Sequence, residues 1–349
     1  MILVLNAGSS SLKAELFGEG LASVLALSVR EIGGAGELRI GAETRPAAAP
    51  DHEAALAMVL KALAEAGHPP ERLTAAGHRV VHGGARRQAA RVTPDLVEEI
   101  RAAIPLAPLH NPANLAGIEA LGRLAPGLPQ TASFDTAFHA SQSDVATAYA
   151  LPEPLRARGL RRYGFHGLSY ASIVARLDPL PERLLAFHLG NGASLCAIRG
   201  GQSVASSMGY SPLSGLVMGT RVGDIDAALV LRLAEEEGIE AAGDILMRQS
   251  GLRGLAGTSD MERLLARDDA EARFAVALFC HAAISHAGAA IAAMGGVDAL
   301  VFTGGIGEHA APVREAITAG LAFLGPLPAH VLPAEEERQI ARDTARLLG

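Results

Sequence analysis

The chain has 349 residues, of which 49% are hydrophobic and 19% are charged, and its formal net charge is −7. This length favours two domains over one, and the apolar fraction is sufficient for a large core. A chain with a negative net charge does not attract nucleic acid or anionic lipid over long distances, so we expect neither partner. The apolar run at the N-terminus is too short for a signal peptide, no apolar stretch approaches membrane-spanning length, and a cytoplasmic location is expected.

A glycine-serine hairpin is predicted at the N-terminus. Residues 2–5 form an apolar run, residues 6–11 (NAGSSS) turn the chain, and apolar residues then alternate with Lys13 and Glu15. The pattern is typical of a strand, a tight turn and a half-buried strand. The alternation places Ser11 and Lys13 on one face, where a hydroxyl and a point charge could meet a phosphate.

Two further glycine turns are predicted to serve the same purpose. The hairpin pattern recurs at residues 184–198 around GNGAS, and a third turn, residues 304–308, lies between an apolar run and a helix-like stretch at 312–321. Glycine lets backbone N–H groups approach a polyphosphate closely. A single glycine turn is better explained as a connection between strands than as a binding site, but three such turns in one chain favour a nucleotide-binding site. No Walker A motif occurs, and GNG leads into a strand, unlike a dinucleotide fingerprint.

Alanine-rich stretches between these turns have helical periodicity. They cover residues 53–66, 226–237, 271–294 and 335–348, and the last is expected to pack back on the first half of the chain. Alternating strands and helices predict α/β layers, and the duplicated hairpin predicts two related halves with a boundary near residues 138–144.

Several segments embed polar residues in apolar frames, which is costly unless those groups are paired or used. His78 and His139 are interpreted as satisfied core histidines, and Asp224 or Asp226 as a helix cap. The spacing of His78 and His82 resembles that of helical zinc ligands, but the valines between them favour a strand and no zinc site is predicted. Both cysteines, Cys196 and Cys280, are interpreted as packing residues.

A second set of polar residues indicates a binding site for an anion. Its members are arginines, which can neutralise oxygens with a planar fork, histidines, which can donate hydrogen bonds, and one carboxylate. We expect them to form one site. They are Arg79, His110, Asp135, His166 and Arg221.

Nine segments together resemble the acetate kinase family, in the family's order and over nearly the whole chain. They are residues 6–13 (NAGSSSLK), 77–84 (GHRVVHGG), 109–112 (LHNP), 134–139 (FDTAFH), 163–167 (YGFHG), 188–192 (HLGNG), 207–212 (SMGYSP), 218–221 (MGTR) and 302–308 (FTGGIGE).

The resemblance implies the two-domain fold of the acetate and sugar kinase, Hsp70 and actin superfamily, an α/β fold with duplicated ribonuclease H-like βββαβαβα domains. The implied domains are residues 1–138 with 334–349, and residues 139–333 for nucleotide binding and dimerisation. ATP and ADP, Mg²⁺ with Mn²⁺ as a possible substitute, and a homodimer are implied as well. The implied reaction is reversible phosphoryl transfer from ATP to acetate, giving acetyl phosphate.

Matched position by position, the family's motifs imply four sets of residues. The catalytic set is Arg79, His110, Asp135, His166 and Arg221; the nucleotide-binding set is Lys13, His188, Gly190, Asn191, Gly192, Asp260, Gly304, Gly305, Ile306 and Gly307; the substrate pocket is Val81, Leu109, Phe165 and Pro212; and the metal-linked residues are Asn6 and Glu336.

The chain departs from the family pattern in five places. It is shorter between residues 324 and 333, and AEEE at 334–337 replaces a usual Thr-Asn-Glu-Glu pattern, with Glu336 as the matched glutamate. Glu262 replaces a usual arginine in a segment that contacts the nucleotide base, and Ser214 and Ala227 replace a glutamate and a proline. These departures leave open the nucleotide base, the dimer contacts and the metal site.

Three alternative functions remain open. A propionate or butyrate kinase would use the same chemistry, because one methylene changes discrimination by only about 1–3 kcal/mol. An ATP-binding peptide clamp or a non-catalytic nucleotide-sensing regulator could share the fold. The direction of the reaction in the cell is likewise open.

Overall fold

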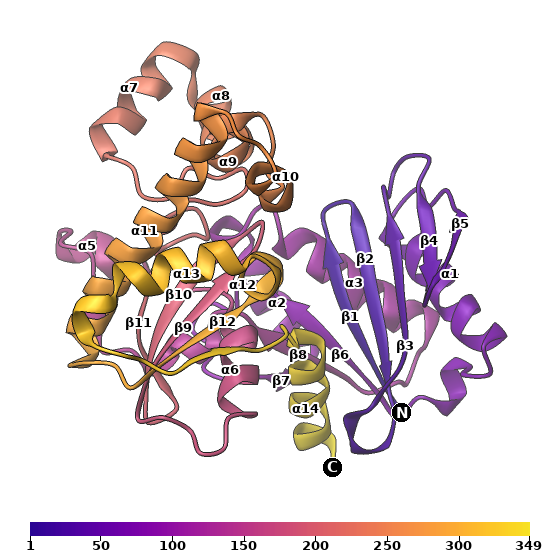
Figure 1. Ribbon diagram of the computed structural model, residues 1–349. Coiled ribbons are helices and arrows are strands. Elements are labelled where there is room, and N and C mark those ends of the chain that lie inside the picture. The colour runs from indigo at the N-terminus through magenta and orange to yellow at the C-terminus, as the bar shows by residue number, and fades with distance from the viewer. The chain divides into compact units, whose positions relative to one another are not determined.

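The computed structural model describes all residues, 1–349, and its contacts divide the chain into two compact units. Unit 1 comprises Met1–Phe138 and Glu335–Gly349, and unit 2 comprises His139–Ala334 (Figure 1). Each unit is built around one β-sheet with helices packed against it.

The sheet of unit 1 has eight strands in the order β5-β4-β3-β2-β1-β6-β8-β7. Strands β1, β2 and β3 are antiparallel neighbours, whereas β6 and β8 run parallel to β1. The strands are β1 (Ile2–Gly8), β2 (Ser11–Phe17), β3 (Ser23–Arg30), β4 (Glu37–Ile40), β5 (Glu43–Pro46), β6 (Ala75–Val80), β7 (Ala90–Arg91) and β8 (Gln130–Phe134).

Buried and less buried residues alternate along β2, and this pattern shows which face of the sheet packs against helices. Leu12, Ala14 and Leu16 are buried and belong to a core cluster with Leu56 and Leu63 of α1 (His52–Glu65). The neighbouring positions of β2 face the opposite side. Helix α3 (Asn111–Leu124) packs on α1, β1 and β6, and α14 (Glu336–Leu348) packs on β1, β6 and β8. The unit is completed by α2 (Pro94–Ala102).

The sheet of unit 2 repeats the central pattern of unit 1. Its order is β11-β10-β9-β12-β13, with an antiparallel β9-β10-β11 meander and β12 and β13 parallel to β9. This order matches β3-β2-β1-β6-β8, so the predicted duplication of a ribonuclease H-like sheet is confirmed. The strands are β9 (Arg183–Leu189), β10 (Ala193–Arg199), β11 (Gln202–Ser206), β12 (Ala299–Thr303) and β13 (Ala329–Val331).

The long helix α11 (Ala270–Met294) packs against β10 and β11 as well as against α9, α10 and α13. By length and composition it could cross a membrane, but a single apolar helix that is packed inside a domain is weak evidence for this. The other helices are α4 (Asp144–Thr147), α5 (Glu153–Arg156), α6 (Gly167–Val174), α7 (Ala227–Glu237), α8 (Ile239–Asp244), α9 (Gly251–Ala256), α10 (Met261–Leu265), α12 (Gly304–His309) and α13 (Ala311–Gly320).

After the last parallel strand of each sheet, the chain continues into the other unit. Helix α6 follows β8 of unit 1 in the chain but contacts β9 of unit 2, and α14 follows β13 of unit 2 but packs on unit 1. The expectation that the C-terminal helix packs on the first half is therefore confirmed. Figure 1 shows α14 beside β6 and β8.

Most of the predicted local structure is confirmed, including a helix cap at Asp226, and one interpretation is corrected. The two hairpins and the helices expected near residues 53–66, 226–237, 271–294 and 335–348 are present. Residues 304–308 are not a turn but the short helix α12, because Gly304 adopts a positive φ of 77° at the end of β12 and the chain then coils. Asp226 caps α7, whereas Asp224 accepts a hydrogen bond from the backbone N–H of Gly215 instead.

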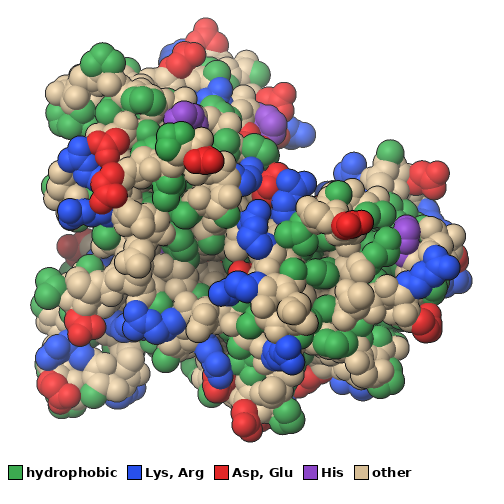
Figure 2. Space-filling view, turned by 90° about the horizontal axis from the view of Figure 1, so that it is seen from below, with side chains coloured by type: hydrophobic (Ala, Val, Ile, Leu, Met, Phe, Trp, Pro, Cys, Tyr) green, Lys and Arg blue, Asp and Glu red, His purple; other side chains and the backbone are tan.

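The buried histidines and cysteines behave as core residues. His78 is hydrogen-bonded to Gln130, at 2.7 Å, and His139 to Ser203 and to the carbonyl of Phe165, each at 2.9 Å. Both cysteines are buried. On the face that Figure 2 presents, acidic and basic side chains are interspersed with hydrophobic ones, in keeping with the modest net charge.

Candidate active site

The first polar cluster lies where the parallel strands of unit 1 end. Carboxyl ends of parallel strands meet at one edge of a sheet, and side chains there lie close together. Leu5 pairs with His78 and Arg79 with Ser133, so Asn6, Arg79 and Ser133 stand level on β1, β6 and β8. Asn6 also pairs with Lys13 on β2, which extends this row of polar residues across the sheet.

Arg79 is the centre of this cluster. Its Nε and Nη2 donate to the two carboxylate oxygens of Asp135, at 3.1 and 2.7 Å, and its Nη1 lies 3.7 Å from Glu336 at the start of α14. A bidentate pair fixes the plane of a guanidinium as well as its charge. Two segments that are far from β6 in the sequence therefore hold this arginine in one orientation.

Burial and neighbouring charges have opposite effects on the pKa values of Arg79 and Asp135. Burial disfavours the charge of Arg79, but Asp135 and Glu336 outweigh burial and hold the pKa of Arg79 above its usual range. Burial also raises the pKa of Asp135, and Arg79 opposes that rise. The pair is thus a structural unit whose two members depend on each other.

His110 precedes α3, and its charge, when present, lowers the pKa of Asp135. Val81 is buried, whereas the side chain of Leu109 is 40% exposed, so of these two substrate-pocket candidates only Leu109 is open to solvent. Asn114 of α3 holds the chain after β6, because it accepts from the N–H of Val81 at 3.0 Å.

The metal-linked candidates offer oxygen donors. Asn6 carries an amide oxygen and Glu336 a carboxylate, and Asp135 supplies a second carboxylate within the same cluster. No group of three or more His, Cys, Asp or Glu side chains is arranged to hold a metal ion by itself. One or two carboxylates, completed by phosphate and water, are the set that Mg²⁺ typically uses, so these donors fit that ion.

The second polar cluster lies in unit 2, around the GNG turn that joins β9 to β10. A Cβ at Gly192 would lie 3.3 Å from Nε2 of His166 and 3.6 Å from Nη1 of Arg221, so both catalytic candidates of this unit approach the glycine. The turn is closed by a hydrogen bond from the N–H of Gly190 to the carbonyl of Gly192 at 3.1 Å. Asn191 accepts at its backbone carbonyl from the N–H of Gly219, at 2.9 Å.

His166 is held in an unusual conformation. Its φ of 59° lies in the left-handed region, which non-glycine residues occupy rarely and mostly at functional or tightly constrained positions. Its Nδ1 is hydrogen-bonded to Ser194 at 2.9 Å, and Ser194 is in turn hydrogen-bonded to Tyr170. His188 stacks on His166 with ring centroids 4.2 Å apart. Ser194 and Tyr170 therefore fix the ring that faces the turn, although the sequence did not single them out.

The guanidinium of Arg221 contacts a backbone carbonyl and a sulfur atom. Its Nη1 donates to the carbonyl of Pro212 at 3.0 Å and lies 3.7 Å from the sulfur of Met218. Pro212 is thus in contact with a catalytic candidate, whereas Phe165, the other pocket candidate of unit 2, is fully buried.

A cavity of about 640 Å³ lies beside the GNG turn. The turn and the start of α12 form one side, the start of α10 forms another, and Leu265, Met261 and Pro312 supply apolar surface. This combination of backbone N–H groups and apolar walls suits a nucleotide. Five nucleotide-binding candidates line the cavity, namely Gly190, Asn191, Asp260, Gly305 and Ile306.

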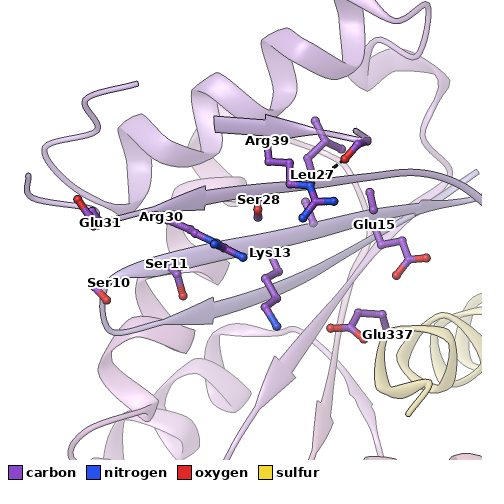
Figure 3. Close-up of a pocket in the computed structure, with 13 residues that line it drawn as sticks. Ser10, Ser11, Lys13, Glu15, Leu27, Ser28, Arg30, Glu31, Arg39 and Glu337 are labelled. Atoms are coloured by element: carbon purple, nitrogen blue, oxygen red, sulfur yellow. Dashed lines mark hydrogen bonds between the residues drawn. The ribbon is translucent and has the colours of Figure 1, made fainter. Parts of the chain in front are cut away.

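The remaining nucleotide-binding candidates lie near this cavity or in unit 1. Gly304 begins α12, and a Cβ there would lie 2.7 Å from the carbonyl oxygen of Leu189, so the close approach of α12 to β9 requires glycine. Gly307 is buried within α12. Lys13 belongs to unit 1, where it lines a different cavity (Figure 3). Glu308, which accepts from the N–H groups of Gly304 and Ala334, was not foreseen from the sequence.

The five catalytic candidates are thus divided between the units. Arg79, His110 and Asp135 belong to unit 1, and His166 and Arg221 belong to unit 2. Within each unit the structure brings the candidates close together.

The chain is similar to known proteins over nearly its whole length. The model of the acetokinase family matches residues 1–341. An acetate kinase of Rhodopseudomonas palustris is 42% identical over 99% of this chain and 98% of its own, in an alignment of 392 positions that exceeds the length of the present chain.

Two solved structures have the same fold. The acetate kinase of Porphyromonas gingivalis superimposes with a TM-score of 0.92 at 34% identity, covering 100% of this chain and 99% of its own. A propionate kinase of Francisella tularensis superimposes with a TM-score of 0.95 at 34% identity, covering 99% of each chain. The chain therefore belongs to the acetokinase family.

Proposed function

We propose that this protein is an acetate kinase that transfers the terminal phosphoryl group of ATP reversibly to acetate, giving acetyl phosphate and ADP. Its membership of the acetokinase family along residues 1–341 carries the proposal. The oriented guanidinium groups of Arg79 and Arg221 support it, because a reaction between two anions requires fixed positive charge.

The chemistry needs no general base. A carboxylate with an ordinary pKa of about 4 is already ionised at neutral pH and can attack phosphorus directly. An acetate oxygen forms a bond to the terminal phosphorus, the bond from that phosphorus to the bridging oxygen breaks, and the electron pair leaves with ADP. Positioning and charge stabilisation should then supply most of the rate.

The residues divide these tasks as follows. Arg79 holds the acetate carboxylate, and Asp135 orients Arg79 through the bidentate pair. Arg221 and His166, which meet at Gly192, stabilise the equatorial oxygens of the transferred group. His110 supports the same charge. The match to the family's motifs assigns the methyl pocket to Val81, Leu109, Phe165 and Pro212.

Asn6 and Glu336, with Asp135, would hold Mg²⁺ or its substitute Mn²⁺. Bound there, the ion would neutralise charge on the β- and γ-phosphates. Lys13 would add a point charge beside the hairpin turn of unit 1, and the glycine turns of unit 2 would hold the nucleotide with His188 and Asp260.

We further propose that the two units are the catalytic domains, with a boundary at residues 138–139 and a return to the first domain near residue 334. Unit 2 would bind the nucleotide and form a homodimer, and the enzyme would act in the cytoplasm without nucleic-acid or membrane partners. Leu229 and Leu231 of α7, which are 46% and 66% exposed, are candidates for the dimer surface.

The decisive experiment compares acceptors. Purified protein is incubated with Mg-ATP and with acetate, propionate or butyrate, and the acyl phosphate is trapped with hydroxylamine. We expect the highest kcat/KM with acetate. A higher value with a longer acid would retain the mechanism and change the acceptor.

The absence of product with every acid, from folded protein that still binds ATP, would overturn the proposal. A peptide clamp or a nucleotide-sensing regulator would then be the better explanation.

A further inference from the structure

One part of the sheet in unit 1 carries an unexplained group of cations. Helices α1 and α3 cover one face, and on the other face α14 packs chiefly on β1, β6 and β8. The portion of that second face formed by β2, β3 and β4 bounds a cavity of about 620 Å³, which Glu337 of α14 closes at one side (Figure 3).

The register of the strands builds a polar row across this cavity. Lys13 on β2 stands opposite Ser28 on β3, and Ser28 stands opposite Arg39 on β4. In the next row Ser11 stands opposite Arg30. Neighbouring strands lie about 4.8 Å apart, so Lys13 and Arg39 originate about 10 Å from each other, within mutual reach of their long side chains.

Two of these cations, Lys13 and Arg39, have no carboxylate partner, and the third, Arg30, has only a long hydrogen bond to Glu37. Lys13 forms no ion pair, Arg39 donates only to the carbonyl of Gly41 at 2.9 Å, and Arg30 is 3.5 Å from an exposed Glu37. By contrast, surface residues such as Arg86 form bidentate pairs with carboxylates. Like charges on adjacent strands repel, so this grouping costs stability unless an anion joins it.

The carboxylates that line the cavity do not fill this role. Figure 3 shows the cations around Ser28 in the middle of the cavity, Glu31 at one end, and Glu15 with Glu337 at the other. Glu15 is also engaged locally, as it accepts a hydrogen bond from Ser23. The cavity is therefore positive at its centre and negative at its ends, which suits a compact anion rather than a long polymer.

We propose that this open face binds a small polyvalent oxyanion of the phosphate class, held by Lys13, Arg30 and Arg39. The hydroxyl groups of Ser11 and Ser28 lie between the cations and can donate hydrogen bonds to its oxygens. The site differs from the nucleotide cavity of unit 2, with which it shares no residue. Lys13 pairs with Asn6 across β1 and β2, next to the proposed catalytic residues. An anion bound at the open face would therefore compete for the ammonium group of Lys13, which the proposed reaction also uses.

The test is a calorimetric titration of inorganic pyrophosphate into the full-length protein with excess ADP present, so that the nucleotide cavity is occupied. We expect one pyrophosphate per chain. Arg39→Gln, which removes one cation from the row, should weaken binding about tenfold or more.

Arg45→Gln is the matched control. Arg45 lies on the neighbouring strand β5, does not line this cavity, and its loss changes the net charge by the same amount. Affinity for pyrophosphate should therefore stay within about twofold of the unmodified protein. The proposal of this site would be overturned if the unmodified protein and both variants bound pyrophosphate with equal affinity, or if none of them bound it.

Phosphoryl transfer provides a separate readout. Arg39 is outside the proposed catalytic residues, so Arg39→Gln should retain acetyl phosphate formation, which also reports that the variant folds. Because the titration does not depend on turnover, the anion site and the proposed reaction can fail independently.

Discussion

Arg221 is the residue whose chemistry is most sharply testable. Lysine would keep the positive charge but lose the planar fork, and it could not reproduce the donation from Nη1 to the carbonyl of Pro212. We expect Arg221→Lys to lower kcat about 100-fold or more, in line with the loss of a transition-state donor, while the unfolding temperature stays nearly unchanged.

The matched control is Arg232→Lys on the exposed helix α7, where the arginine pairs only with Glu236. It should leave steady-state turnover unaffected. Near-normal turnover by Arg221→Lys would refute the role assigned to Arg221.

Glu262 is the residue most relevant to the choice of nucleotide. It lines the nucleotide cavity, where a carboxylate can accept hydrogen bonds but cannot donate them. Guanine offers a ring N–H beside an exocyclic amine, whereas adenine offers only its amine. We expect the ratio of kcat/KM for GTP to that for ATP to fall about threefold or more in Glu262→Gln.

Glu240→Gln, on the exposed start of α8 and outside the cavity, serves as the charge-matched control and should not change this ratio. Inosine triphosphate lacks the exocyclic amine of guanine, so it should respond to Glu262→Gln less than GTP does. An unchanged GTP to ATP ratio would show that Glu262 does not read the base.

Several residue roles could not be read from sequence patterns. The sequence indicated Arg79 and Asp135 as members of one anion site, but their bidentate pairing depends on β6 and β8 being parallel neighbours, which no local pattern reveals. Ser194 and Tyr170 were missed for the same reason, because they matter only through their contact with His166.

At the level of elements, the packing of α14 on β6 depends on one glycine. A Cβ at Gly77 would lie 2.4 Å from Oγ1 of Thr344 and 2.7 Å from Cγ2 of Ile340, both on α14. We expect Gly77→Ala to displace α14 and lower the free energy of unfolding by about 1–3 kcal/mol in a denaturant titration. Since α14 carries Glu336, the affinity for Mg²⁺ in the kinase assay should fall as well.

Gly122→Ala provides the comparison for that variant. Gly122 lies inside α3 of the same unit, and its added Cβ would meet only Nε2 of Gln130, at 3.7 Å. Alanine is the better helix former by about 1 kcal/mol, so this change should be neutral or stabilising. Equal stability of the two variants would contradict the packing argument.

Periodic elements were predictable, and glycine-rich ones less so. The two hairpins and the long helices follow from alternation and helical spacing, which are local properties. Residues 304–308 resembled a turn, but they form α12, because the positive φ of Gly304 and its close approach to Leu189 are set by the neighbouring strand β9. Strands β3, β4 and β5 were not foreseen as separate elements.

At the scale of the whole molecule, acid should destabilise both units over the same pH range. Burial lowers the pKa of His78, in unit 1, to about 4, and that of His139, in unit 2, also to about 4. The unfolded chain has histidine pKa values near 6.5 and binds these protons first. Stability should therefore decline as pH falls from about 6.5 towards 4.

Denaturant titrations at a series of pH values measure this decline, and NMR of the histidine ring protons assigns it. In the folded protein His78 and His139 should remain neutral at pH 5. Protonation of either buried ring above pH 6 in the folded state would contradict the prediction.

The exchange of terminal helices has a consequence for synthesis. Residues 139–334 leave the ribosome before residues 335–349 do, so unit 2 has its full set of strands while unit 1 still lacks α14. The surface of β1, β6 and β8 that α14 later covers is exposed in the nascent chain during that interval. Unit 1 therefore contains the first residues of the chain but is the last unit to be completed. Another segment that bound the uncovered sheet before α14 was synthesised would prevent α14 from packing there and Glu336 from reaching Arg79.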